Sequence, residues 1–440
     1  EHPQGWKDAF DAATSLTRLA LLGVVPGLKA EALLQTARQS MPAAAITAGQ
    51  VLAMDLIRLR ARFGFGNKKD THRKIMALRH ALAGQQEQLW QLELLAIEVA
   101  WKSGDLSALD QRLDRLRQAI PQKHPLQFDV ANLKALILHA TGRLGAARQA
   151  YAAAKSALIY VPAAGVAERE GALHNNLGRL EMDAGHTDAA LKYFRSALDM
   201  DERRRDRVGQ LFDRKNLGQL LLKLGKNREG IAMLTKAVDA ARTLRLAAVQ
   251  AEATAHVLLV GNNTSVAEAL AFRAFVAKHR LHQFDWVAQW LSGDIQRRQG
   301  MTVEAEASLR RAMAIVEQEG NAAFASGLLQ PIRVYDALIA LLYKTQPELA
   351  HGIAERALNW KYGTGVEEDV ATRSAEQGSR LLYFSGDHST WVWYGAGGKK
   401  GSLRLHIGRQ DLMQRIANLN RDVVLRRPVQ QQAKALARLI

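Results

Sequence analysis

The sequence predicts a mainly α-helical solenoid, a right-handed superhelix of antiparallel helix pairs, followed by the truncated start of an α/β domain. A residue that closes a helical turn recurs at intervals of 36 to 43 residues, and small or apolar residues recur five and twelve positions after it. Small residues at fixed places let paired helices approach closely, so each unit buries its face against the next. The turn residues are Gly104, Gly142, Gly185, Gly225, Thr264 and Gly300.

The composition agrees with a stacked helical array. With 440 residues and 48% hydrophobic content, the chain exceeds the usual size of a single core, and stacked repeats avoid that limit. Aromatic residues make up only 6% of the chain, whereas Ala, Leu, Arg and Gln are frequent, which favours helices over sheets. The absence of Cys excludes disulfides, thiolate metal sites and a cysteine nucleophile within these residues.

The charge indicates an acidic partner. Sixty Lys and Arg against 43 Asp and Glu give a net charge of +17, which suits a protein, a nucleic acid or a membrane surface. Nucleic acid is not expected unless through a partner, because neither aromatic residues interleaved with the basic ones nor a helix-turn-helix is found. The longest apolar stretch, residues 19–28, is too short to cross a bilayer. We expect a cytoplasmic location, while a removed signal peptide, with a secreted or periplasmic location, and an oligomer stay open.

The chain divides into four regions. Residues 1–84 have a helical pattern without the turn residue, which indicates N-terminal capping helices. Residues 85–358 contain about six to seven helix pairs, and prolines lie between the pairs rather than within them. Residues 359–378, with several glycines and three consecutive acidic residues, indicate a linker, and residues 379–440 form a separate region. The prolines are Pro121, Pro125, Pro162 and Pro331.

Two consecutive units carry the most complete repeat motif. The first reads His174-Asn175-Asn176-Leu177-Gly178, then Gly185, Asp188-Ala189-Ala190, Tyr193-Phe194 and Ala197-Leu198, and its successor reads Lys215-Asn216-Leu217-Gly218, Gly225 and Ala237. This pattern resembles tetratricopeptide repeats of the long, roughly forty-residue kind. We expect glycine at positions 178 and 218 because a side chain there would meet the second helix of the pair. The unit around Thr264 departs most, with Arg273 where a large apolar residue belongs.

A strand pattern follows the repeats. Leu381-Leu382-Tyr383-Phe384 and Trp391-Val392-Trp393-Tyr394 are separated by Ser385-Gly386-Asp387-His388, which predicts a hairpin. A third strand is expected at residues 402–407, after a Gly-Lys turn, and the helical period returns from Arg409 with an apolar face. That face consists of Leu412, Ile416, Leu419 and Val423.

This ending resembles the opening of a CHAT domain, a caspase-like module that follows such repeats in many bacterial proteins. The resemblance covers about sixty residues, and it implies a bacterial stress or defence cysteine protease whose repeats recognise an activator, inhibitor or substrate. The catalytic His and Cys of that family lie beyond these residues, so the resemblance assigns no catalytic residue here.

The sequence predicts a partner-binding site on the first helices of two repeats. Asn176 and Asn216 occupy equivalent places, where the resemblance implies an Asn that bonds the backbone of an extended ligand, and an amide both donates and accepts. Arg179, Lys215 and Gln219 lie one or two helical steps away and are expected on the same concave side. The alternative is that these polar residues only solvate the inner surface.

Other patterns point to weaker hypotheses. Arg203-Arg204-Arg205 with Arg207 suits carboxylates or phosphates, or is a solvated basic loop. His279 and His282 have metal-ligand spacing, but no further ligand is evident, which favours surface histidines. Residues 395–401 are rich in Gly and Lys but lack the ending of a phosphate loop.

No catalytic, metal or cofactor site is therefore predicted, and the enzyme class of these residues stays undecided. The alternative function is a repeat scaffold or sensor domain of a regulator, or an adaptor, without protease activity.

Overall fold

The computed structural model describes residues 39, 68–102, 104–105, 108–261, 264–320, 326–362, 379–386, 389–396, 399–409, 411–412 and 414–415. The chain forms two compact units, residues 1–254 and 255–440, each described by itself below. The capping helices predicted for residues 1–84 lie outside the described residues except for residue 39 and the part from residue 68 onward. Most of the predicted linker, from residue 363 to 378, also lies outside them.

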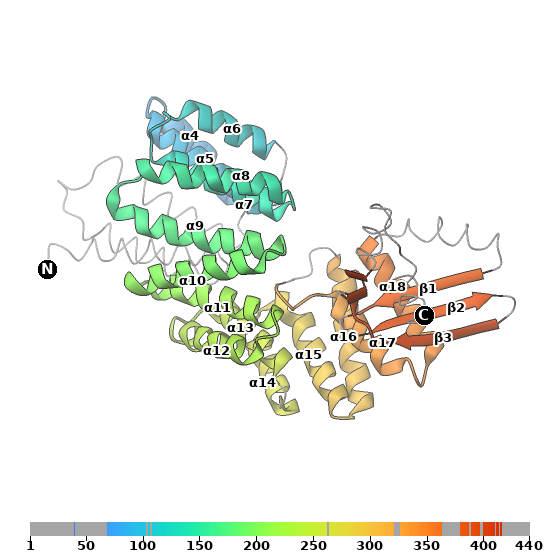
Figure 1. Ribbon diagram of the computed structural model, residues 1–440. Coiled ribbons are helices and arrows are strands. Elements are labelled where there is room, and N and C mark those ends of the chain that lie inside the picture. Colours follow the sequence, from blue (N-terminus) through green and yellow to red (C-terminus); the bar gives the residue numbers. More distant parts are fainter. Residues whose placement is uncertain are drawn as a thin grey trace, which may run out of the picture. The chain divides into compact units, whose positions relative to one another are not determined.

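The first unit is a series of helices joined by short turns (Figure 1). The second helix of each pair packs most extensively on the first, as in α7 with α8, α9 with α10 and α11 with α12. Consecutive pairs then pack on each other, as α10 does on α11. The helices are α4 (Lys68–Ala81), α5 (Gln86–Lys102), α6 (Leu109–Ala119), α7 (Leu126–Ala140), α8 (Leu144–Ala157), α9 (Ala163–Asp183), α10 (Thr187–Arg203), α11 (Arg207–Lys223), α12 (Asn227–Thr243) and α13 (Ala247–Val260), which spans the division between the units.

Glycine closes five of the six predicted turns with a left-handed backbone. The φ angles of these five glycines lie between 73° and 82°, a region that glycine enters without steric cost. The residues five and twelve positions later are buried in every one of the six units, as the repeat pattern predicts. The predicted mainly α solenoid of paired helices is therefore confirmed.

Two further glycines let the paired helices touch. A Cβ atom on Gly178 would lie 2.6 Å from the Phe194 ring, and one on Gly218 would lie 2.7 Å from Leu234. Both contacts are shorter than real Cβ atoms tolerate, so a side chain at either position would force the helices apart. The expectation that a side chain here would meet the second helix is confirmed.

The second unit continues the helix pairs and ends in a small sheet (Figure 1). α15 and α16 form its most extensive pair, and α17 packs on both α16 and α18. The helix α18 continues to residue 362, inside the stretch predicted as a linker. The helices are α14 (Val266–Lys278), α15 (Asp285–Arg298), α16 (Thr302–Glu319), α17 (Ile332–Leu342) and α18 (Pro347–Tyr362), with short 3-10 turns at His282–Phe284 and, in the first unit, at Leu158–Tyr160.

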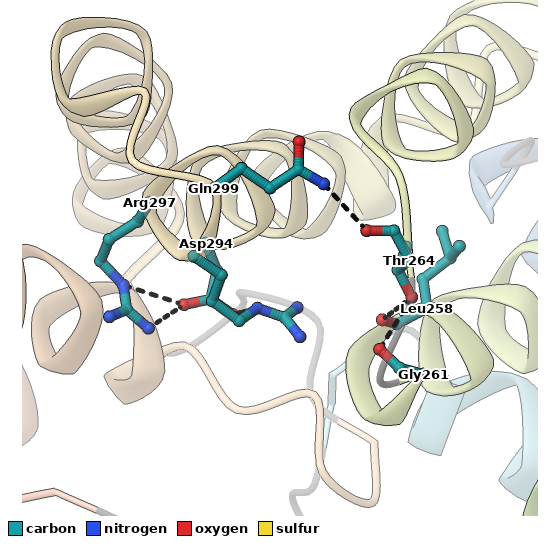
Figure 2. Close-up of polar contacts among 7 residues, drawn as sticks. Leu258, Gly261, Thr264, Asp294, Arg297 and Gln299 are labelled. Atoms are coloured by element: carbon teal, nitrogen blue, oxygen red, sulfur yellow. Dashed lines mark hydrogen bonds and ion pairs between the residues drawn. The ribbon is translucent and has the colours of Figure 1, made fainter.

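The one predicted turn without glycine, at Thr264, is held by side-chain hydrogen bonds. Figure 2 shows the Thr264 hydroxyl donating to the carbonyls of Leu258 and Gly261, both at 3.1 Å, while the Thr264 carbonyl accepts from Gln299 at 3.3 Å. Ser265 then caps the N-terminus of α14 through reciprocal hydrogen bonds with Glu268, a capping box. Hydrogen bonding thus replaces the glycine of the other turns.

Arg273, which departs from the repeat pattern, is half-buried on α14. The buried large apolar residue of this helix is Phe272, one position earlier. The apolar contact of this unit is therefore displaced by one residue relative to the other repeats.

The predicted hairpin is confirmed as part of a three-stranded antiparallel sheet in the order β1-β2-β3. Its strands are β1 (Ser379–Ser385), β2 (Thr390–Ala396) and β3 (Lys399–Leu405), with Phe384 opposite Trp391. β3 begins at residue 399, earlier than the predicted 402, because residues 399–401 pair with residues 394–396. The Trp393 ring meets Tyr343, directly after α17, and His351 of α18 edge-on, which places the sheet against these helices.

The helix predicted from Arg409 is described only at its start. Residues 409, 411, 412, 414 and 415 are helical, whereas Ile416, Leu419 and Val423 lie outside the described residues. Over the described part of the chain, no helix combines the length and the hydropathy that a membrane span requires.

Candidate functional site: a polar ladder on the first helices

Side-chain hydrogen bonds join the first helices of successive repeats in the first unit. Asn176 on α9 donates through Nδ2 to Oδ1 of Asn132 on α7 at 3.3 Å. Asn216 on α11 donates in the same way to Asn175 on α9 at 2.8 Å. In both bonds the donor lies nine residues before its turn glycine, and the acceptor lies ten residues before the turn glycine of the preceding repeat. We call these four residues the Asn ladder, since its bonds recur with the repeat.

A charged step extends the Asn ladder toward the end of the unit. Lys215 lies ten residues before the next turn glycine, which is the place of Asn132 and Asn175 in the earlier repeats. It donates through Nζ to Oε1 of Glu252 on α13 at 2.8 Å. Gln219 donates to the same oxygen at 2.9 Å. The side chains of Lys215 and Glu252 are each only 12% exposed, so this pair is less screened by water than an ordinary surface pair. The hydrogen bond from the side-chain amide of Gln219 further stabilises the partly buried carboxylate of Glu252.

Burial divides the five predicted site residues into two groups. Asn216 and Gln219 are only 6% and 4% exposed, and a buried amide requires hydrogen-bond partners, which the neighbouring helices provide. Asn176 is half-buried and Arg179, one helical turn further on, is exposed. The residues on α11 therefore join the repeats, whereas those on α9 present polar atoms to the solvent.

Arg179 is a cation without a carboxylate partner. It forms no hydrogen bond or ion pair with any residue that the structure describes. Its charge acts on the buried Tyr151, where it opposes the increase in the phenol pKa that burial causes. An exposed guanidinium with unused donors is able to bind a carboxylate in a bidentate manner.

The sequence analysis missed Asn132, Asn175 and Glu252. Asn132 and Asn175 both lie ten residues before a turn glycine, so counting back from each turn glycine would have found them. Glu252 lies twelve rather than ten residues before Thr264, so the repeat pattern does not identify it. A second interhelical pair, Arg169 on α9 with Asp129 on α7 at 3.2 Å, runs beside the ladder.

The same repeats enclose a pair of buried carboxyl groups. Asp201 on α10 and Asp213 on α11 are 6% and 2% exposed. Burial and the neighbouring Asp201 charge raise the pKa of Asp213 to about 8, so this carboxyl group is protonated at neutral pH and bonds to Asp201. A Cβ on Gly209 would lie 1.7 Å from the Asp201 carboxylate, so only glycine fits at this position in the present packing.

Asp206 and Arg204 complete this cluster. Asp206 caps α11 by accepting from the backbone N–H groups of Val208 and Gly209, both at 3.0 Å. Arg204 donates to Asp206 at 2.7 Å and lies 3.4 Å from Asp201. The Arg204 charge lowers the pKa of Asp213, but it only partly opposes burial and the charges of Asp201 and Asp206, which raise it.

The two histidines with metal-ligand spacing do not converge on a common point. His282 lies 3.2 Å from the Asp285 carboxylate, whereas the ring of His279 lies 4.4 Å from that of Phe275. Among the described residues, no group of three or more His, Asp and Glu side chains is arranged to hold a metal ion.

Paired helices at a period of about forty residues, glycine-closed turns and a polar row on the first helices define a protein of the helical-repeat class. Comparison with protein families agrees, since the model described as Tetratricopeptide repeat matches residues 169–243. The matched residues run from within α9 to the end of α12, so the similarity covers the helix pairs α9–α10 and α11–α12. The match does not extend to the strands, and no curated protein matches the chain.

Several solved structures are similar to this chain at low sequence identity. Aspartyl phosphate phosphatase F from Bacillus subtilis is 10% identical, with a TM-score of 0.51 over 80% of this chain and 94% of that one. A Rap protein complexed with competence and sporulation factor is 14% identical, with a TM-score of 0.44 over 85% and 99%. A signal transduction ATPase with a tetratricopeptide repeat sensor, from Pyrococcus horikoshii, is 12% identical, with a TM-score of 0.49 over 79% and 53%. At 10% identity, the likeness to the phosphatase, whose TM-score is above 0.5, concerns the fold alone.

Proposed function

We propose that the first-helix face of α9 and α11 binds an extended segment of a partner protein. The Asn ladder is the observation that carries this proposal, because it presents amide groups at the repeat spacing. Each amide has two N–H donors and a carbonyl with two lone pairs, and the ladder uses only part of this capacity. The remaining groups on Asn175 and Asn176 match the donors and acceptors of a peptide backbone.

The five predicted site residues take two roles in this proposal. Asn176 and Arg179 contact the partner, with Arg179 binding an acidic side chain of it. Lys215, Asn216 and Gln219 hold α11 against its neighbours and thereby fix the spacing of the contacts. An acidic partner also agrees with the net charge of +17.

Selection from a phage-displayed library of random peptides tests this proposal. We expect the protein to enrich acidic peptides that the double variant Asn176→Ala, Arg179→Ala fails to retain. The matched control is Asn227→Ala, Arg228→Ala, which removes the same two residue types from exposed positions on the second helix α12. Equal retention by both double variants, or enrichment of no peptide by the wild type, would contradict the proposal.

A second candidate function concerns the strands. The sheet follows α18 and buries Phe384, Trp391, Val392 and Trp393, which are among the residues that resemble the opening of a CHAT domain. This supports a proposal that the repeats form the regulatory region of a bacterial caspase-like cysteine protease. The product of the complete parent gene should then cleave peptides, and replacement of its catalytic Cys by Ala should abolish cleavage. A parent gene that encodes no such Cys would favour the scaffold, sensor or adaptor alternative.

A further inference from the structure

Three exposed arginines lie at one edge of the first unit without acidic partners. Arg205 follows the second helix α10, Arg245 follows the second helix α12, and Arg207 is the first residue of α11. None of the three forms a hydrogen bond or ion pair with a described residue. Because second helices of successive repeats run in the same direction, the ends of α10 and α12 lie at the same edge of the array. We call these three residues the arginine edge.

The carboxylates near this edge are already engaged. Asp199 pairs with Arg203, and Glu202 accepts from Arg214 at 2.8 Å. Asp206 accepts from Arg204 at 2.7 Å. Asp239 pairs with Arg242 at 3.0 Å. The positive charge of the arginine edge is therefore not neutralised by the surrounding fold.

Two residues of the arginine edge occupy a backbone conformation that favours glycine. The φ angle is 57° at Arg205 and 56° at Arg245, each twenty residues after its turn glycine. At the corresponding place after Gly300 stands Gly320, with a φ angle of 55°. An L side chain is strained at such angles, so arginine is not the residue that backbone stability selects.

The third residue also opposes a local rule. Arg207 lies in the first turn of α11, where the helix dipole favours an anion, and this turn contains no acidic residue. Residues that oppose local stability without a compensating contact are expected where function requires them. A cation at the end of α10 or α12 is favoured by the helix dipole, but a lysine or arginine within the last turn would provide that without positive φ.

We propose that the arginine edge binds an acidic segment of a partner protein, at a surface separate from the Asn ladder. Guanidinium groups bind carboxylates in a bidentate manner, as the neighbouring Arg203 does with Asp199, and Arg204 donates a single bond to Asp206. A polypeptide is favoured over nucleic acid because residues 203–207 and 242–246, which contain the arginine edge, include no aromatic residue on which a base would stack.

Binding of a fluorescein-labelled decaglutamate peptide, followed by fluorescence anisotropy, tests the proposal. The double variant Arg205→Gly, Arg245→Gly should weaken binding about tenfold or more, because it removes two charged hydrogen-bonding groups. Its melting temperature should stay equal to or exceed that of the wild type, since glycine relieves the strain of positive φ. A loss of affinity with retained stability separates binding from folding.

The control removes the same amount of charge from the helices α10 and α12 themselves, which precede Arg205 and Arg245. Arg195→Ala on α10 with Arg228→Ala on α12 deletes two exposed arginines away from the edge, and it should change the affinity by less than about threefold. Equal weakening by this control would show a general charge effect and overturn the proposal, as would wild-type affinity of the glycine variant. Tighter binding of a single-stranded thymidine oligonucleotide, lost in the glycine variant, would assign the edge to nucleic acid instead.

The glycine variant also distinguishes the two surfaces. The double variant Arg205→Gly, Arg245→Gly should retain a peptide selected on the Asn ladder with an affinity within about threefold of the wild type. A loss of that peptide as large as the loss of decaglutamate would mean that both peptides occupy one surface, and it would overturn the assignment of a separate surface.

Discussion

The first helices α11 and α15 share the glycine that contacts the second helix of the pair, which we call the frame position. They differ in the residues at the two ladder places. Gly218 in α11 and Gly293 in α15 both admit a leucine of the second helix, with Cβ contacts of 2.7 and 2.6 Å. At the places ten and nine residues before the turn glycine, α11 carries Lys215 and Asn216. At the same places α15 carries two buried apolar residues, which are Trp290 and Leu291.

The comparison separates positions that specify the hairpin from positions that vary with function. The glycines recur in both units because helix contact requires them, whatever the unit binds. The two ladder places are free of that constraint and become apolar again in α5, which carries Leu94 and Leu95 there. Polar residues at both places in α9 and α11 are therefore a local feature, as a binding site requires.

The largest effect should follow from placing a ladder residue in the apolar unit. Leu291→Asn removes a buried apolar side chain and buries an amide without a partner, so it should lower the free energy of unfolding by about 3 kcal/mol. Urea denaturation followed by circular dichroism measures the change. A loss below about 1 kcal/mol would mean that α15 accommodates polar residues as α11 does, and the comparison would fail.

The shared frame should respond alike in both units. Gly218→Val and Gly293→Val should each lower the free energy of unfolding by about 2 to 3 kcal/mol, because the added atoms collide with a leucine of the second helix. Gly145→Ala on α8 is the control, since its Cβ meets no atom within 4 Å, and it should stabilise the helix by about 0.5 kcal/mol. Unequal costs at the two frame positions would argue against a common hairpin.

The carboxyl pair in the polar repeats should make their stability depend on pH. The pKa of Asp213 is raised from 3.8 to about 8 in the folded state, so its contribution is present at low pH and is lost as the pH rises through this window. Asp213→Asn, which cannot ionise, should match the wild type near pH 5 and exceed its free energy of unfolding by about 2 kcal/mol above pH 8. A constant difference between the two proteins across this range would contradict the assignment.

Removal of a ladder bond should cost less than any of these changes. Asn216→Ala leaves the Asn175 carbonyl without its donor and should lower the free energy of unfolding by about 1 kcal/mol. Asn227→Ala on the exposed face of α12 should remain within about 0.5 kcal/mol of the wild type. Indistinguishable values for the two variants would show that the ladder does not join the repeats.

The smallest effect concerns the turn without glycine. Thr264→Val keeps the shape of the side chain but removes the hydroxyl that donates to Leu258 and Gly261, and we expect a loss of about 0.5 to 1 kcal/mol. Thermal melting is sensitive enough to detect this difference. A stability equal to or above that of the wild type would mean that the capping box at Ser265 alone holds the turn.

The frame was predictable from sequence because each of its residues acts within one helix pair. The repeat period identified the turns, and glycine at positions 178 and 218 predicted close contact between the paired helices. The strands β1 and β2 were equally accessible, since their aromatic and β-branched residues lie in two continuous runs.

The ladder was not predictable in the same way, because its bonds join different repeats. Asn132 and Asn176 lie 44 residues apart, and only the packing of α7 on α9 brings the two amides together. Burial also decided which predicted residues face solvent, and a helical pattern alone does not distinguish Asn176 from the more buried Asn216. The caspase-like assignment of residues 379–440 stays a prediction.

The most direct test of the ladder as a binding face is hydrogen–deuterium exchange of the protein with a peptide selected on it. The account predicts slower exchange in α9 and α11 and unchanged exchange in α15, whose ladder places are apolar. Slower exchange in α15, or in the second helices α10 and α12 without α9 and α11, would contradict it.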